Sequence, residues 1–271
     1  AWLRLCFPPM YQPIHCMHSK LMLLFHPEKL RIAIPSANLL TFDWGETGVM
    51  ENSVFIIDLP RLPDGGKAEA DELPPFAQEL LYFLRRQQLD RDVREGLLNF
   101  DFSATEGMMF VHTVGGSHFD DEAERTGLSG LAHAVRQLGL ESQDGLQVDF
   151  AASSIGSLND DFLKTVHAAA RGEDMIARAE TATTTTKPKA DFFKPSTTTT
   201  PRPRTAAATQ DIRDLLRIYF PTHNTVTASK AGSAGTICLN RKWFESEKFP
   251  RTCFRDYRST RTGLLSHNKI L

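Results

Sequence analysis

Two His-x-Lys triplets stand at opposite ends of this chain, and their side chains are suited to phosphate chemistry. They are His18-Ser19-Lys20 and His267-Asn268-Lys269. A neutral histidine can attack phosphorus, because its ring nitrogen is nucleophilic near neutral pH and the phosphohistidine that forms can later be hydrolysed. A second histidine opposite the first can protonate the leaving oxygen and then deprotonate water. One triplet alone is weak evidence, but two predict a single site that processes a phosphate ester.

The two lysines and Asn38 fit the same reaction. Their donor groups would stabilise the equatorial oxygens of the phosphorus as charge builds, which replaces a metal ion. We therefore expect no metal and no other cofactor. His15 and Cys16 lie close to His18, but further ligands at metal-binding spacing are missing, so a zinc site is not favoured.

The first triplet precedes two short apolar runs that indicate strands. Residues 21–25 and 30–34 are separated by the turn-like tetrapeptide 26–29, so they predict a hairpin of two buried strands. Lys20 leads directly into the first strand and Asn38 follows the second. The histidine, the lysine and the asparagine can therefore converge at neighbouring strand ends.

Strands and helices alternate along the rest of the chain. This alternation indicates an α/β protein whose sheets are covered by helices. Residues 212–220 form an apolar run, and 243–257 has a helical pattern that Pro250 would break or kink. Apolar periodicity predicts strands over 53–59, 107–114 and 146–152, and helices over 76–89, 90–99, 122–140 and 160–171.

Composition excludes several classes of protein. The chain has 271 residues, 41% of them hydrophobic, and a formal net charge of -2, so bulk basicity gives no argument for nucleic-acid binding and a phosphate ligand would need a local cluster of donors. Four cysteines without a C-x-x-C pair fit a reducing compartment. No membrane span or secretory signal is visible, which predicts a cytosolic or nuclear protein. The Thr/Pro-rich tract over about 181–208 is expected to be a disordered insertion.

The surroundings of the first triplet resemble a known family. The blocks 18–24 and 30–39, followed by Asp43-Trp44, are similar to the phospholipase D superfamily and, within it, to tyrosyl-DNA phosphodiesterase of fungal type. Phospholipases of the superfamily usually carry an aspartate five positions after the lysine, where this chain has Phe25. The asparagine 18 positions after Lys20 is typical of the tyrosyl-DNA enzyme, which argues against a lipid hydrolase.

The resemblance extends through residues 114–117, 150–158 and 266–269, and it assigns roles. His18 would be the nucleophile that becomes linked to a DNA 3′ phosphate, and His267 the general acid that releases tyrosine and then the base that activates water. Asn52 lies near the family's amide that orients the acidic histidine, although the alignment there needs a shift. The remaining roles are phosphate contacts by Lys20, Lys269 and Asn38 and DNA-backbone contacts by Ser154 and Ser157. The alternative for the two serines is a plain polar loop after a strand.

The resemblance also implies an α/β fold with two related phospholipase D-like halves and the active site at their interface. Each half would be a mixed sheet flanked by helices, the first over 1–120 and the second over 121–271. The family's preceding strands, its second asparagine and the acid that orients the nucleophile have no counterpart here. We therefore expect a fragment truncated at both ends.

The function that follows is hydrolysis of the bond between a DNA 3′ phosphate and a tyrosine, as left by topoisomerase I. The expected partner is a single-stranded or nicked DNA 3′ end bearing a tyrosyl peptide, with no membrane involved, and a nuclear monomer is expected. Two alternatives remain. One is another superfamily phosphodiesterase acting on phospholipid or plain nucleic acid, and the other is a non-catalytic remnant that binds DNA ends.

Overall fold

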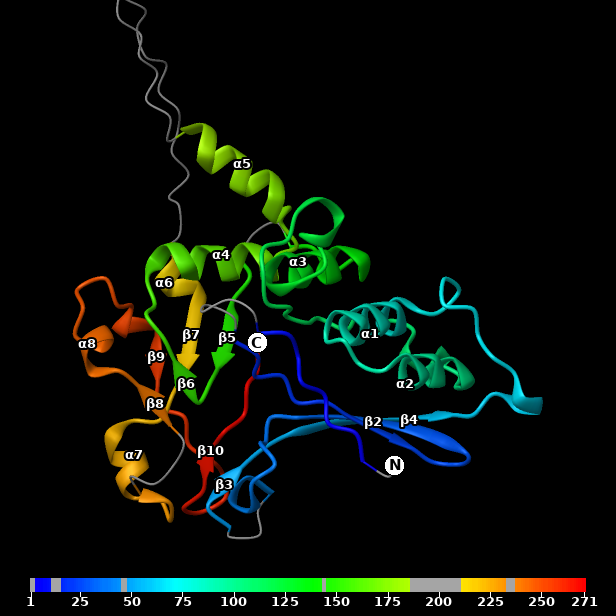
Figure 1. Cartoon of the computed structure of the whole chain (residues 1–271). Coiled ribbons are helices and arrows are strands. Elements are labelled where there is room, and N and C mark those ends of the chain that lie inside the picture. Colours follow the sequence, from blue (N-terminus) through cyan, green and yellow to red (C-terminus); the bar gives the residue numbers. More distant parts are fainter. Residues whose placement is uncertain (1–2, 11–15, 45–47, 143–144, 186–210, 233–236) are drawn as a thin grey trace, which may run out of the picture.

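The computed structural model describes residues 3–10, 16–44, 48–142, 145–185, 211–232 and 237–271. They form a mixed α/β fold with several small sheets and helices (Figure 1), in agreement with the expected class. Among the helices of the described residues, none is long and apolar enough to cross a membrane.

A three-stranded antiparallel sheet follows the first His-x-Lys triplet. Strands β1 (Met22–Phe25) and β2 (Lys29–Pro35) form the predicted hairpin, with Met22 opposite Ala33. Strand β4 (Val54–Pro60) pairs with the other edge of β2. Because β2 is bonded on both sides, the chain that leaves its end toward Asn38 starts from a fixed position.

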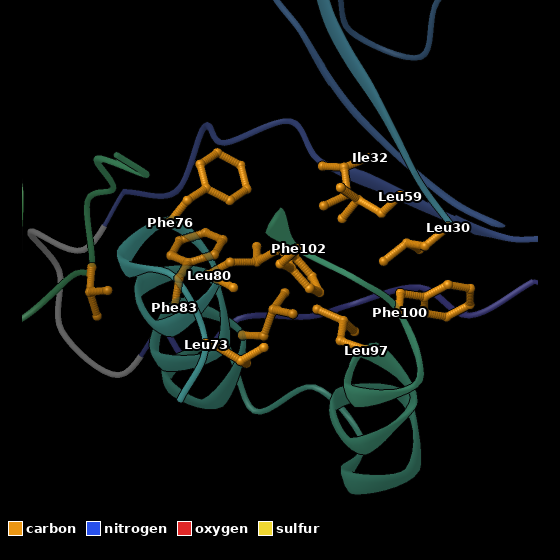
Figure 2. Packing of buried hydrophobic residues seen from close by; sticks show 13 residues of the cluster. Leu30, Ile32, Leu59, Leu73, Phe76, Leu80, Phe83, Leu97, Phe100 and Phe102 are labelled. Carbon is orange, nitrogen blue, oxygen red and sulfur yellow. The ribbon is translucent and has the colours of Figure 1, made fainter. Parts of the chain in front are cut away.

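Helices α1 (Pro75–Arg86) and α2 (Arg91–Gly96) lie over this sheet (Figure 1). Helix α1 begins at a proline, whose missing N–H is tolerated in the first turn, and ends at two arginines that suit the negative end of the helix dipole. Its apolar face packs on the sheet to form the first core, which Figure 2 shows. The side chains of this core include Leu30, Ile32, Leu59, Phe76, Leu80, Phe83, Leu97 and Phe100.

A second sheet, of parallel strands, organises the C-terminal part. Its order is β5 (Val148–Ala151), β7 (Leu216–Tyr219) and β9 (Phe254–Arg255). Helices α3 (Gly127–Gln137) and α4 (Asp160–Ala170) pack on each other above it (Figure 1). The second core includes Val148, Leu163, Val166, Leu216, Ile218 and Phe249.

Short elements complete the described fold. Strand β6 (Ser154–Ile155) pairs in parallel with β8 (Cys238–Leu239). The other helices are α5 (Met175–Thr185), α6 (Ile212–Leu215), α7 (His223–Thr227) and α8 (Arg241–Phe244). Short 3-10 turns cover Thr41–Trp44, Pro63–Gly65, Leu97–Asn99, Ser103–Thr105, Asp120–Glu122 and Arg251–Cys253.

The last strand joins the two parts of the fold. Strand β10 (Leu265–Ser266) pairs in parallel with β3 (Met50–Glu51), which belongs to the first part of the chain (Figure 1). A few residues later Ile270 and Ala151, at the end of β5, exchange both backbone hydrogen bonds, at 2.8 and 3.1 Å. The second His-x-Lys triplet therefore lies between these two attachments and has little freedom to move.

Several sequence predictions need correction. The expected strand over 107–114 is absent apart from one bridge between His112 and Thr126, because Phe110 and His112 pack against Phe83 of α1 instead of joining a sheet. The expected helix over 122–140 begins only at Gly127, whose φ of 62° is left-handed and separates it from the preceding turn.

Two more predictions fail in part. The expected helix over 243–257 is reduced to α8, because the residues after Pro250 form β9 at the edge of the second sheet. The start of the tract expected to be disordered is helical, since α5 continues to Thr185. The rest of that tract, 186–208, lies outside the described residues.

Candidate active site

One cleft of about 670 Å³ brings together side chains from both ends of the chain. His18 and Lys20, just before β1, line it together with Lys269, which follows β10. His267 does not line this cleft, and its side chain is 4% exposed, but its ring nitrogens lie 3.0 Å from Lys269 Nζ. The positive charges of Lys20 and Lys269 both act on His18 and on His267. The two triplets therefore share one electrostatic environment.

The two triplets have the same internal geometry. Lys20 Nζ lies 3.0 and 3.1 Å from the two ring nitrogens of His18, and Lys269 Nζ lies 3.0 Å from both ring nitrogens of His267. A lysine nitrogen at this distance from both ring nitrogens would overlap the ring carbons if it lay in the plane of the imidazole. Each ammonium group therefore lies above the face of its histidine ring. Each lysine also donates to the carbonyl of its own histidine, at 2.8 and 2.7 Å.

Asn52 fixes the orientation and the tautomer of His267. Its Nδ2 donates to the carbonyl of Asp43 at 2.8 Å, so its Oδ1 faces His267 Nδ1 at 2.9 Å. An amide oxygen only accepts, which places the ring proton on Nδ1 and leaves Nε2 with a free lone pair. Ser36 Oγ donates to the same Oδ1 at 2.9 Å and holds the amide from the other side.

Burial and neighbouring lysines keep both histidines neutral. Desolvation lowers the pKa of His267 to about 4, helped by the charge of Lys269 and opposed by that of Asp43. Desolvation and the charges of Lys20 and Lys269 also lower the pKa of His18. The pKa of Lys269 falls to about 8, again chiefly through desolvation. At neutral pH the site therefore holds two neutral imidazoles beside two ammonium groups.

Asn38 is held rigidly at the edge of this cluster. Its backbone N and its Nδ2 both donate to Asp43 Oδ2, at 2.8 and 2.6 Å, and Trp44 Nε1 donates to its carbonyl at 2.7 Å. One amide hydrogen of Asn38 remains available for a ligand. Asp43 was visible in the sequence only as part of the Asp-Trp pair, and its burial could not be deduced from that pair.

The predicted DNA-binding serines lie elsewhere. Ser154, on β6, lines a second pocket together with Asn240 and Trp243, and Ser157 is exposed in the turn before α4. None of the four His-x-Lys side chains lines that second pocket. Contacts and the shared cleft thus group His18, Lys20, Asn38, Asn52, His267 and Lys269, while neither Ser154 nor Ser157 lines this cleft.

The family to which this arrangement belongs is identified by comparison. The family model of tyrosyl-DNA phosphodiesterase matches residues 2–271. The chain belongs to the tyrosyl-DNA phosphodiesterase family. Membership implies a phosphodiesterase of DNA repair whose substrate is a DNA adduct. No individual curated protein matches the chain significantly.

In this member of the tyrosyl-DNA phosphodiesterase family, the cleft that holds His18, Lys20 and Lys269 also has an apolar wall. Sequence reasoning did not assign these residues to the site. The one available signal was the apolar face of α1, which supplies two of the rings. The wall includes Phe55, Phe76, Phe83, Met108 and Phe110.

Loss of the Asn52 amide is expected to impair this tyrosyl-DNA phosphodiesterase site through His267. Asn52→Ala should slow release of tyrosine from a 3′-tyrosyl oligonucleotide by roughly 5- to 150-fold, because an orphaned buried hydrogen-bonding group costs about 1–3 kcal/mol. Single-turnover kinetics measure this loss. The matched control is Asn99→Ala, which removes another half-buried amide, bonded to the Gly96 carbonyl and outside the cleft. Equal rates for both variants would show that the Asn52 contact is dispensable.

Proposed function

We propose that this protein hydrolyses the phosphodiester between a DNA 3′ phosphate and a tyrosine, through a covalent phosphohistidine. The observation that carries the proposal is one cleft lined by His18, Lys20 and Lys269, with a second neutral histidine, His267, whose ring lies 3.0 Å from Lys269 Nζ. Their matched geometry also supports two related halves that each contribute one triplet. Repair of topoisomerase I adducts would place the protein in the nucleus.

The first step uses His18 as nucleophile. A ring nitrogen of His18 attacks phosphorus, the bond from phosphorus to the tyrosine oxygen breaks, and His267 donates a proton from Nε2 to that oxygen. His267 must enter this step as an imidazolium, although its pKa in the free protein is about 4. The negative charge of the bound phosphodiester raises this pKa, because it offsets the charges of the two lysines.

The second step uses the tautomer that the structure favours. After giving up its Nε2 proton, His267 keeps the Nδ1 proton that is bonded to Asn52. The free Nε2 then takes a proton from water, the water oxygen attacks phosphorus, and the bond from phosphorus to His18 breaks. The products are a DNA 3′ phosphate and the starting enzyme. Asn52 thus makes His267 ready to act as a base.

The lysines and Asn38 bind the phosphoryl oxygens. Lys20 and Lys269 now donate to backbone carbonyls within their own triplets, and a small rotation of each flexible side chain turns the ammonium toward a ligand. The spare amide hydrogen of Asn38 adds a third donor. With these three donors around the equatorial oxygens, the charge of the transition state is stabilised.

The apolar wall supports an aromatic leaving group. The four phenylalanines and Met108 lie in the same cleft as the lysines. Aromatic rings and methionine sulfur pack well against another aromatic side chain. A tyrosyl group on one side of the phosphorus therefore suits this surface.

A panel of substrates tests the proposal. The protein should release tyrosine from a 3′-tyrosyl oligonucleotide and leave phosphatidylcholine and plasmid DNA intact. Because lysines supply the positive charge, excess EDTA should leave the rate unchanged. Activity that vanishes in EDTA and returns with magnesium would contradict the two-histidine mechanism. Binding without turnover, unaffected by His18→Ala, would instead support a DNA-end binding remnant.

A further inference from the structure

Asp43 is a buried carboxylate at the base of the cleft. Its side chain is 0% exposed, and it lies in the 3-10 turn after β2. Burying a charge is costly unless it is paired and hydrogen-bonded. Oδ2 accepts two bonds from Asn38, but Oδ1 accepts none from the described residues. A charge kept in such a place needs an explanation beyond the anchoring of Asn38.

The groups that face Asp43 are the cations of the cleft. His267 Nδ1 lies 4.0 Å from Oδ1, and within the described chain no lysine or arginine nitrogen comes within 4.0 Å of the carboxylate. Its negative charge nevertheless acts on Lys20, Lys269 and His267 alike, and raises the pKa of each against the effect of burial.

The neighbouring carboxylate on β3 is already engaged. Glu51 Oε2 accepts a bond from Ser259 Oγ at 2.8 Å and lies 3.8 Å from Arg261. Asn52, the next residue, is neutral and places its Nδ2 on the Asp43 backbone carbonyl. Among the described residues, Asp43 is therefore the buried carboxylate whose charge acts on Lys20, Lys269 and His267.

We propose that Asp43 is a positioning residue whose fixed negative charge keeps Lys269 protonated and stabilises the protonated form of His267 during the first step. The part of this proposal that concerns His267 rests on the proposed function, because the imidazolium of His267 is used in that reaction. The same carboxylate holds the Asn38 backbone and amide through two hydrogen bonds. Its charge, and not only its hydrogen bonds, is what the reaction requires.

The sign of the pH effect follows from this role. A negative charge favours the protonated forms of Lys269 and His267, so removing it lowers both pKa values. Both groups must be protonated for the first step. The rate therefore falls as pH rises through their pKa values, and the alkaline limb of the pH profile should move to lower pH when the charge is removed.

The test replaces the charge and keeps the shape. Asp43→Asn should lower the pKa of Lys269 from about 8 by about one unit or more, the size typical for a nearby opposite charge. Lysine side-chain NMR measures this shift without any substrate. In single-turnover release of tyrosine, the alkaline limb should move by a similar amount, which lowers the rate about tenfold at pH values above the limb.

Control variants separate charge from structure. Asp43→Glu keeps the charge and should leave the alkaline limb near its wild-type position, and Asp43→Ser is a second neutral variant if the asparagine form does not fold. Asp58→Asn removes an exposed carboxylate on β4, outside the cleft, and should change neither readout.

Two outcomes are distinguishable. An unmoved Lys269 pKa in the folded neutral variants would overturn the role of Asp43, even if they turn over slowly. Absence of turnover in the wild type would refute the proposed function, while the NMR titration would still decide whether Asp43 balances the lysines.

Discussion

His18→Ala is expected to abolish turnover of a 3′-tyrosyl oligonucleotide. The substitution removes the nitrogen that bonds to phosphorus, so the chemical step loses its nucleophile, and losses of this kind reach roughly a thousandfold or more. No covalent protein–DNA adduct should form, because no other described side chain in the cleft offers a nucleophilic nitrogen in the same place. Denaturing gels after acid quench and single-turnover release of tyrosine measure the two effects.

The substitution His26→Ala is the matched control for a loss of folding. His26 lies exposed in the turn between β1 and β2, so His26→Ala should retain full activity. His18 is itself exposed and bonded only to Lys20 among the described residues. The thermal stability of His18→Ala should therefore equal that of the wild type. Turnover by His18→Ala at a wild-type rate would assign the nucleophile elsewhere.

His267→Ala is expected to make the covalent adduct accumulate. Without the base, water attacks the phosphohistidine slowly, and losses from removal of a general base are about 100- to 10,000-fold. The first step also slows, but a tyrosine whose oxygen takes its proton from solvent still leaves. A denaturing gel of a 5′-labelled strand should show a DNA–protein band that persists far longer than in the wild type.

Two further variants make this result decisive. The double variant with His18→Ala should show no adduct, since the linkage forms on His18. His167→Ala removes another buried histidine, whose Nε2 contacts the Leu146 carbonyl away from the cleft, and it controls for loss of packing. An adduct that is hydrolysed at the wild-type rate in His267→Ala would assign the base to another group.

Local patterns predicted the elements near the first triplet well. The hairpin of β1 and β2 and the helix α1 follow from apolar runs bounded by a turn and by proline, and such signals are local. The segments that failed were decided by distant neighbours. Residues 107–114 had strand-like composition but pack against α1, and residues 254–255 became a strand only because β7 offers a free edge.

The candidate site divides in the same way. Spacing in the sequence identified His18, Lys20, Asn38, His267 and Lys269, and family likeness placed Asn52 loosely near the acidic histidine. The contact of Asn52 with His267 joins residues 215 positions apart, so no local pattern contains it. The apolar wall of the cleft was invisible for the same reason.

By itself the sequence determined which side chains can carry out phosphoryl chemistry, because residue type and short spacing are properties of the chain. Tertiary structure alone decided that the two triplets meet, through the pairing of β10 with β3 and of Ile270 with Ala151. It also decided the pKa of His267 and the burial of Asp43. Desolvation and Coulomb forces depend on distances in space, which the order of residues does not specify.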